Sequence, residues 1–195
     1  MNAKNRNQTL GTVVAILAII GITWAAMAGV GQPGIKEQIQ KGNQIKEGSV
    51  APYYKTAPPT SGAYYPSAAN CRIYDTELPV PQFIHNLRNG NIVLLYKRAI
   101  DSTTWGKIRA LQDTLANNGW FLAAPYENMT KKLSVVAWGW HLDLDEYDEK
   151  QVMDFYDAHR EQGMEHIPCI VEKSLPPKAQ INTPGIPSVT AVPVK

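Results

Sequence analysis

Hydrophobic residues form one long uninterrupted run near the amino terminus of this chain and several short runs after it. Residues 10–30 (LGTVVAILAIIGITWAAMAGV) contain no charged side chain and are followed at once by the sequence Gly-Gln-Pro-Gly at 31–34. A helix of this length covers roughly 30 Å, the thickness of the hydrocarbon layer of a bilayer. The run predicts a transmembrane helix, with residues 1–9 as a cytoplasmic tail and a single tethered domain after it.

A cleaved signal peptide is the alternative interpretation of this run. Lys4 and Arg6 precede it as a basic region, and Ala26-Met27-Ala28 resembles a cleavage site. Signal peptides, however, have apolar regions of roughly 7–15 residues, and this run is longer. Its length favours an uncleaved anchor.

Small residues line one face of the predicted membrane helix at spacings of three and four. Such faces let membrane helices pack closely, so this face predicts contact with another integral membrane subunit. The residues of the face are Ala18, Gly21, Ala25, Ala28 and Gly29.

The orientation of the predicted anchor depends on its flanking charges. Lys4 and Arg6 precede the run, whereas Lys36, Lys41 and Lys46 follow it, so the positive-inside count is nearly balanced. A short basic amino-terminal tail usually stays cytoplasmic. We therefore expect a single-pass protein of the cytoplasmic membrane with its domain on the periplasmic or extracellular side.

The pattern after the anchor predicts an α/β (α+β) domain over residues 50–172, preceded by a stalk at 31–49. Short apolar runs at 92–96, 120–124 and 133–140 predict strands. Helical spacing predicts one helix from Ser102 or Thr103 to about Asn118, and a second over 148–162 with acidic residues in its first turn. The expected core is a sheet of three or four strands packed with two helices.

Proline-rich segments lie on both sides of this core. Residues 49–81 carry no helical or strand period and predict either a long loop packed on the core or a binding loop. Residues 173–195 contain five prolines and cannot form a core of their own. This tail is expected to be either disordered or extended across a neighbouring protein.

Charge and cysteine content narrow the range of functions. The net charge is +2 with acidic and basic residues interspersed, which gives no electrostatic footprint for nucleic acid. The two cysteines, Cys71 and Cys169, lack the spacing of a redox motif. In an oxidising compartment they would form one long-loop disulfide; the alternative is two buried free thiols.

Two motifs resemble a known bacterial family. The first runs from Tyr54 through Pro-Pro-Thr-Ser-Gly at 58–62 to Tyr64-Tyr65, and the second is IHNLRNGNIV at 84–93. Ile73-Tyr74, the Ala-Trp pair at 137–138 and the stretch 161–165 add weaker similarity. Together these features, over about residues 50–169, resemble the domain of unknown function 3105, whose members are mostly membrane-anchored or secreted.

The resemblance implies a site with most of its ligands replaced. The family signatures read approximately P-P-T-S-G-P-H-Y and V-H-S-L-E-H-G-x-V, and their His and Glu residues would suit a transition metal. In this chain His85 matches one position, whereas Tyr64, Arg88 and Asn89 stand where the family has His, Glu and His. An arginine in such a site adds a positive charge that opposes cation binding. The expectation is no metal and no cofactor, with His85 as the alternative ligand.

Other combinations of residues give weaker signals. His141, His159 and His166 are near acidic residues and Cys169 in sequence, but their spacing matches no standard metal-ligand pattern, and His159 falls on the apolar side of a predicted helix. The acidic run at 143–149 lacks the glycine and terminal glutamate of a calcium loop. No nucleophile and base can be paired, so the sequence does not predict an enzyme.

The combined expectation is a non-catalytic accessory subunit that docks onto a larger membrane complex. A respiratory or photosynthetic electron-transfer assembly is one such complex. The alternative is an extracytoplasmic copper-type binding protein that uses His85 with Tyr64 or with histidines of the second half. An enzyme of unrecognised class is the third hypothesis.

Overall fold

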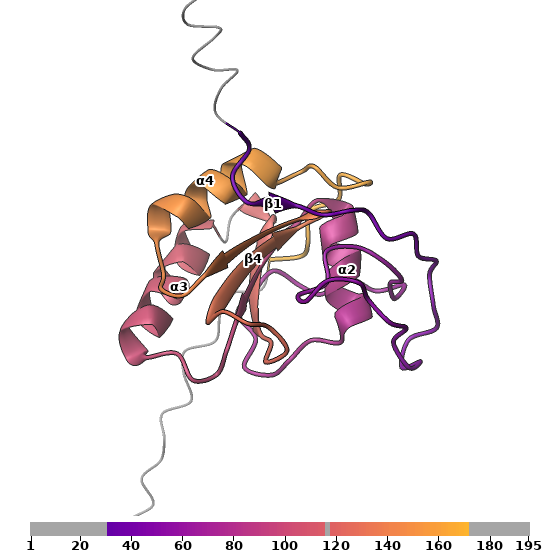
Figure 1. Cartoon of the computed structure of the whole chain (residues 1–195), viewed down its shortest axis with the longest axis horizontal. Coiled ribbons are helices and arrows are strands. Elements are labelled where there is room, and N and C mark those ends of the chain that lie inside the picture. Colours follow the sequence, from indigo (N-terminus) through magenta and orange to yellow (C-terminus); the bar gives the residue numbers. More distant parts are fainter. Residues whose placement is uncertain (1–30, 116–117, 172–195) are drawn as a thin grey trace, which may run out of the picture.

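The computed structural model describes residues 31–115 and 118–171. A mixed five-stranded sheet lies at its centre, with the strand order β1-β5-β4-β2-β3. The elements along the described chain are β1 (Ile35–Lys36), α2 (Val80–Asn89), β2 (Ile92–Tyr96), α3 (Ser102–Leu115), β3 (Phe121–Pro125), β4 (Leu133–Ala137), β5 (Trp140–Leu144) and α4 (Glu149–His159). Figure 1 shows α2 standing apart from α3 and α4 across this sheet.

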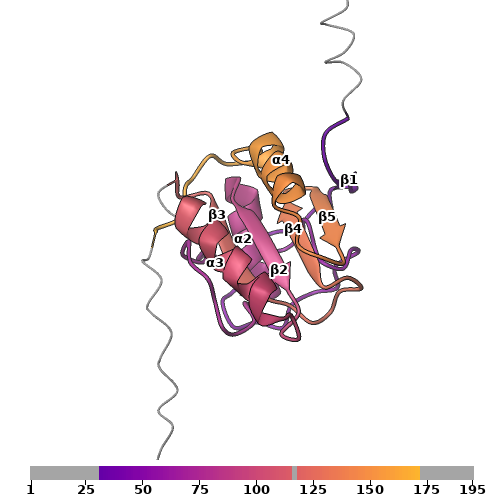
Figure 2. The ribbon, with the colours of Figure 1, turned by 90° about the vertical axis from the view of Figure 1, so that its left-hand side faces the viewer.

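Helices cover both faces of the sheet because its central strands are apolar on both sides. Along β2, Ile92 and Leu94 pack with the buried residues of α3 and α4, whereas Val93 and Leu95 pack with those of α2. Figure 2 shows α3 and α4 together on one side of the strands, with α2 on the other. A continuous apolar strand is typical of a sheet that is buried on both faces.

The two halves of the sheet are connected differently. β2 and β3 are parallel, with Ile92 opposite Phe121, and the chain crosses between them through α3. β4 and β5 form an antiparallel hairpin, and Gly139 at its turn has a φ of 71° that favours glycine. β4 also pairs antiparallel with β2.

The predicted α+β class is confirmed, but the counts of strands and helices were wrong. The expected strand at 133–140 is a hairpin whose second strand, β5, extends to Leu144. The helix α2 was not predicted. Ser102 or Thr103 was expected to cap the helix α3, but Ser102 is its first residue and Asp101 caps it, because the Asp101 carboxylate accepts the Thr104 N–H at 2.9 Å.

The second predicted helix agrees closely with α4. Asp148 is its N-cap, and the Asp148 side chain accepts the Gln151 N–H. This satisfies one of the free donors of the first turn. Val152, Phe155, Tyr156 and His159 form its buried side, so His159 is a core residue.

Residues 31–57, which we call the arm, run along the edge of the sheet and around its α2 side. Ile35 pairs with His141 across β1 and β5, and the Glu37 N–H donates to the Gly139 carbonyl at 2.8 Å. Figure 1 shows this indigo segment passing from β1 toward the loops beside α2. The stretch expected to be a stalk therefore lies against the domain.

The arm continues into a loop that is fixed by side-chain hydrogen bonds. The Gln40 amide donates to the Tyr53 carbonyl and accepts the Lys55 N–H, each at 2.9 Å. The Tyr65 hydroxyl donates to the Ser49 carbonyl, also at 2.9 Å. The start of the proline-rich segment is thus held against the domain by side-chain hydrogen bonds, while Tyr53 itself stays exposed.

Candidate functional site

The helix α2 positions the two charged or titratable residues of the second motif. Pro81 lies in its first turn and Gly90 ends it with a φ of 95°, so the helix has a well-defined start and stop. Ile84 and Leu87 face the core. His85 and Arg88, three residues apart, lie on the half-exposed side and can share one partner.

Tyr64 of the first motif is that partner. Its ring meets His85 edge to face, with ring centres 5.4 Å apart, and the guanidinium carbon of Arg88 lies 4.7 Å from its centre. The ring pair brings the positive edge of one ring to the negative face of the other, and the guanidinium lies over the negative face of the Tyr64 ring. Three of the four motif positions, Tyr64, His85 and Arg88, are therefore brought together.

The carboxylate of Glu165 completes this cluster from the segment after α4. Arg88 donates from Nη2 at 2.8 Å and from Nε at 3.1 Å to the same oxygen of Glu165. Arg88 also donates from Nη1 to the Met164 sulfur at 3.2 Å, and its backbone carbonyl accepts the Glu165 N–H at 2.9 Å. Each of the three guanidinium nitrogens thus donates one hydrogen bond.

The electrostatics of this cluster oppose a bound cation. Arg88 is a permanent positive charge beside His85, and it already neutralises the carboxylate of Glu165. Burial lowers the pKa of His85, with a smaller lowering effect from Arg88, while a backbone hydrogen bond to Tyr65 and the charge of Glu165 act in the opposite direction. The cluster therefore offers a single imidazole beside a permanent positive charge.

The first motif has a structural role in this fold. The Thr60 carbonyl accepts the Gly139 N–H at 3.0 Å, and the Ser61 hydroxyl accepts the Gln40 N–H at 2.8 Å. Gly62 adopts a φ of 133°, which favours glycine. The motif thus joins the arm to the β4–β5 hairpin and places Tyr64 over α2.

The comparisons with known proteins give a family and nothing further. The family described as "Protein of unknown function (DUF3105)" matches residues 46–170, more than half of the chain. The chain belongs to the DUF3105 family. No curated protein matches it, and no solved structure matches its fold. The resemblance expected from the two motifs is confirmed.

Asn89, the fourth motif position of this DUF3105 domain, does not share the contacts of the other three. Its backbone carbonyl accepts the Ile167 N–H at 3.1 Å. Its side chain is buried, and the amide oxygen has no hydrogen-bond partner among residues 31–115 and 118–171. Asn89 fixes the chain after α4 to the end of α2 rather than adding a ligand to the cluster.

Buried amides beside the cluster hold the end of α2 in place. Asn86 accepts the Ala69 N–H and donates to the Ala69 carbonyl, each at 2.8 Å, and donates to Asn91 at 3.0 Å. Asn91 in turn donates to the Ile167 carbonyl at 3.2 Å. These asparagines belong to the second motif but serve packing.

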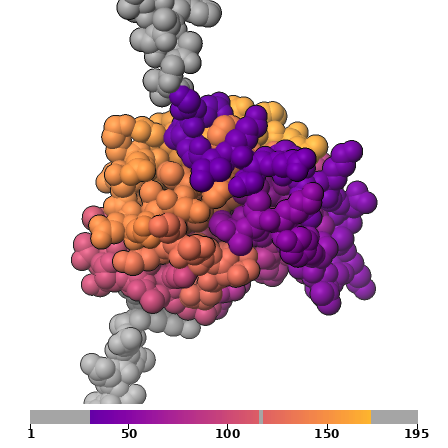
Figure 3. Space-filling view, viewed as in Figure 1, coloured from indigo at the N-terminus to yellow at the C-terminus, as the bar shows by residue number. Residues whose placement is uncertain are grey.

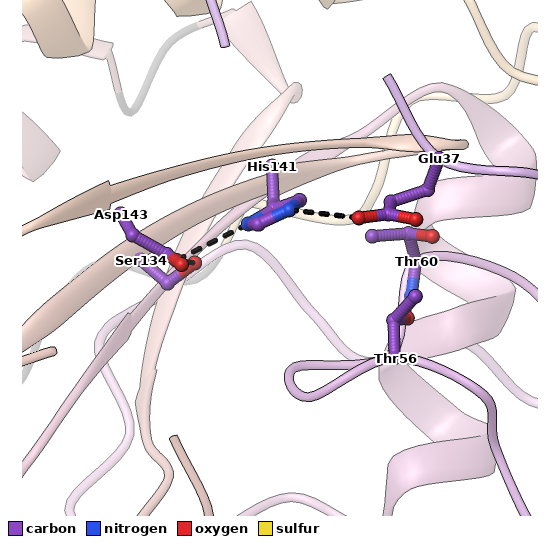
Figure 4. A network of polar contacts seen from close by, with 6 residues as sticks. All are labelled: Glu37, Thr56, Thr60, Ser134, His141 and Asp143. Atoms are coloured by element: carbon purple, nitrogen blue, oxygen red, sulfur yellow. Dashed lines mark hydrogen bonds and ion pairs between the residues drawn. The ribbon is translucent and has the colours of Figure 1, made fainter. Parts of the chain in front are cut away.

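A second polar cluster of the DUF3105 domain lies at the edge of the sheet. Figure 4 shows the imidazole of His141 between the carboxylates of Glu37 and Asp143. Nε2 lies 3.1 Å from Glu37 Oε1, and Nδ1 lies 3.3 Å from Asp143 Oδ1 without hydrogen-bond alignment. Ser134 donates its hydroxyl to Asp143 at 2.7 Å, so this hydroxyl is not aimed at the imidazole as a nucleophile would be.

The metal-ligand group suggested by the remaining histidines does not form. His141 binds Glu37 instead, His159 packs between Trp140 and Phe155, and Cys169 is disulfide-bonded. Within the described part of the chain, no three His, Cys, Asp or Glu side chains are placed to hold a metal ion.

The two cysteines form a disulfide, which settles the alternative left open by the sequence. The Cys71 and Cys169 Cα atoms are 5.4 Å apart, and 98 residues separate them in sequence. The bond joins the loop before α2 to the segment after α4. Like the Arg88–Glu165 pair, it fixes the chain that follows α4 to the rest of the domain.

A separate cavity of about 260 Å³ opens near the start of α3. Its polar lining mixes both signs of charge, from Asp101, Lys107, Lys132, Asp145 and Glu146. Lys107 also lies over the ring of Tyr147, 5.8 Å from its centre. The lining contains no residue of the family motifs.

The small-residue face predicted for the membrane helix, Ala18, Gly21, Ala25, Ala28 and Gly29, lies outside the described residues. Among residues 31–115 and 118–171, no helix is long and apolar enough to cross a bilayer.

Proposed function

We propose that this protein is a single-span, membrane-anchored accessory subunit whose DUF3105 domain docks onto a larger membrane complex without catalysing a reaction. The placement of exposed apolar side chains is the observation that carries this proposal. Large hydrophobic side chains that are exposed in the described chain fall on two segments only: the arm (Ile35, Ile39, Val50, Tyr53) and the segment after α4 (Met164, Ile167, Ile170, Val171). Exposed apolar groups collected in this way are typical of protein interaction sites.

The arm presents its apolar residues on a rigid loop. Tyr53 is 82% exposed although its carbonyl is held by the Gln40 amide. Figure 3 shows the indigo atoms of the arm gathered over one side of the molecule. A fixed loop loses little conformational entropy when it binds, and tyrosine is enriched among the residues that dominate interface energies.

The state of the motif cluster supports a binding role over a chemical one. Arg88 pairs with Glu165 and stacks on Tyr64, so the groups that would hold a cation or act on a substrate are occupied by each other. The disulfide supports the proposed location, because such bonds persist in oxidising compartments outside the cytoplasm. The uncharged run at 10–30 supports the membrane anchor.

The test is purification of the native protein from its own membranes in mild detergent, with mass spectrometry and elemental analysis of the same sample. The expected result is one or more integral membrane proteins in stoichiometric amount, without an equivalent of metal. A protein that purifies alone at native abundance would contradict the proposal.

Copper-type binding is the second candidate, and one observation favours it. The Nδ1 atom of His85 is buried without a hydrogen-bond partner in the described residues, and the Met164 sulfur lies in the same cluster. Imidazole and thioether are ligands that copper accepts. Titration of the purified protein with Cu(I) distinguishes the two proposals. The docking proposal predicts no stoichiometric copper binding. Stoichiometric binding that the His85→Ala substitution abolishes without unfolding the protein would favour the copper-binding proposal.

A further inference from the structure

Met164 combines two features that the other methionines of the described chain lack. Its side chain is 59% exposed, and the Arg88 Nη1 atom donates a hydrogen bond to its sulfur at 3.2 Å. Met129 is buried in the core, and Met153 of α4 packs partly buried against it. Among residues 31–115 and 118–171, Met164 is therefore the methionine that an oxidant in solution reaches most readily.

Sulfur oxidation in this domain is confined to its methionines. Both cysteines of the chain are joined in the disulfide Cys71–Cys169, so neither offers a thiol to an oxidant. A methionine thioether is oxidised to the sulfoxide, and methionine sulfoxide reductases restore it. An exposed methionine should therefore be the first sulfur to react with a peroxide.

Arg88 is fixed so that one of its nitrogens serves the sulfur and the other two serve Glu165. Nη2 and Nε donate to the same oxygen of Glu165 at 2.8 and 3.1 Å, and the guanidinium carbon lies 4.7 Å from the centre of the Tyr64 ring. Figure 1 shows the chain after α4 passing the end of α2, where the Glu165 N–H donates to the Arg88 carbonyl. Nη1 can thus hold a new acceptor without loss of the ion pair.

The oxygen of a sulfoxide would be a better acceptor for Nη1 than the thioether is. A thioether sulfur accepts hydrogen bonds only weakly, whereas a sulfoxide oxygen carries partial negative charge and here meets a charged donor. The exposed and flexible side chain of Met164 lets this oxygen turn toward Nη1. Oxidation of the buried Met129 would instead place a polar group in the core.

We propose that Met164 is a reversible oxidation site for peroxides and that the Arg88 guanidinium holds the oxygen of its sulfoxide. The sulfur lone pair attacks one oxygen of hydrogen peroxide and the O–O bond breaks. The proton on the transferred oxygen passes to the departing hydroxide, which leaves as water. The sulfur is oxidised and the peroxide is reduced. This site goes beyond the proposed accessory function and does not depend on it, because it requires no partner.

Limited treatment of the detergent-purified full chain with hydrogen peroxide tests where oxidation occurs. A chelator is present, so that metal-catalysed oxidation is excluded. Peptide mapping by mass spectrometry measures the fraction of each methionine that has gained an oxygen atom. Met164 is expected to be converted while Met129 and Met153 stay unmodified. Conversion of either of these two as fast as Met164 would overturn the inference.

The thermal midpoint tests the role of Arg88. Oxidation of Met164 is expected to raise the midpoint of the wild type by about 2 °C, because the folded state gains a charged hydrogen bond, and a sulfoxide reductase should reverse this rise. The Arg88→Ala variant should show no rise. In the matched control, Met164→Leu, the same treatment should leave the midpoint unchanged. A wild-type midpoint that does not rise, or an equal rise in Arg88→Ala, would overturn the inference.

Discussion

The guanidinium carbon of Arg88 lies 4.7 Å from the centre of the Tyr64 ring. These residues come from the two family motifs, so the contact joins the proline-rich loop to α2. The same guanidinium donates to Glu165, 77 residues further along the chain. The cluster is an internal tie between three segments of the chain.

Removing the contacts of Arg88 should reduce the stability of the fold only modestly. We expect Arg88→Ala to lower the free energy of unfolding by about 1–2 kcal/mol, because the ion pair with Glu165 is partly exposed and the stack on Tyr64 contributes a similar small amount. Arg88→Lys keeps the positive charge but loses the planar guanidinium, so its free energy of unfolding should lie between those of the wild type and Arg88→Ala. Chemical denaturation measures both; an unchanged midpoint for Arg88→Ala would show that the tie is not stabilising.

Asn86 should matter more than Arg88 despite having no charge. We expect Asn86→Ala to destabilise the fold by about 2–3 kcal/mol, since it leaves the N–H and carbonyl of Ala69 buried without their partner. Gln82→Ala, on the half-exposed side of α2, is the matched control. Equal midpoints for the two variants in urea would contradict this role.

The disulfide should account for a large share of stability. Reduction, or the double substitution Cys71→Ala and Cys169→Ala, is expected to cost about 3–5 kcal/mol, because the bond closes a loop of 98 residues in sequence. Denaturation with and without reductant measures this loss. The double variant is its own control, since reductant should have no further effect on it.

Stability should also fall on mild acidification. Burial lowers the pKa of His159 below its usual 6.5, so the unfolded chain binds a proton more readily than the folded one. The free energy of unfolding is therefore complete above about pH 6.5 and decreases as the pH falls through that value toward the folded pKa. His159→Gln should lessen this decline without abolishing it, because burial lowers the pKa of His85 as well. His166→Gln, at an exposed position, should leave the decline unchanged. A parallel decline in all three proteins would contradict the assignment.

The sequence predicted what depends on local pattern. The apolar run IVLLY predicted β2 to the residue, and the apolar stripe with its acidic first turn predicted α4, whose N-cap proves to be Asp148. The helix α2 was not predicted, although Pro81 and Gly90 mark its ends. The pairs Arg88–Glu165 and Glu37–His141 join residues far apart in sequence, and one sequence carries no signal for such contacts.

Two of the missed features decide the interpretation of the site. The sequence showed that Arg88 opposes a cation, but not that Glu165 would neutralise it or that Met164 would lie beside it. It also left Cys71 and Cys169 as either a disulfide or two thiols, a choice that needs their 5.4 Å separation. Local chemistry was predictable, whereas the partners of each group depend on the fold.

Hydrogen exchange of the full chain, compared between the detergent-purified protein alone and its native membrane assembly, tests the central claim most directly. The docking account predicts slower exchange in the assembly for peptides that cover the arm around Tyr53 and the segment after α4 (Met164–Val171), with the exchange of β2 unchanged. Identical exchange of both segments in the two states would contradict it.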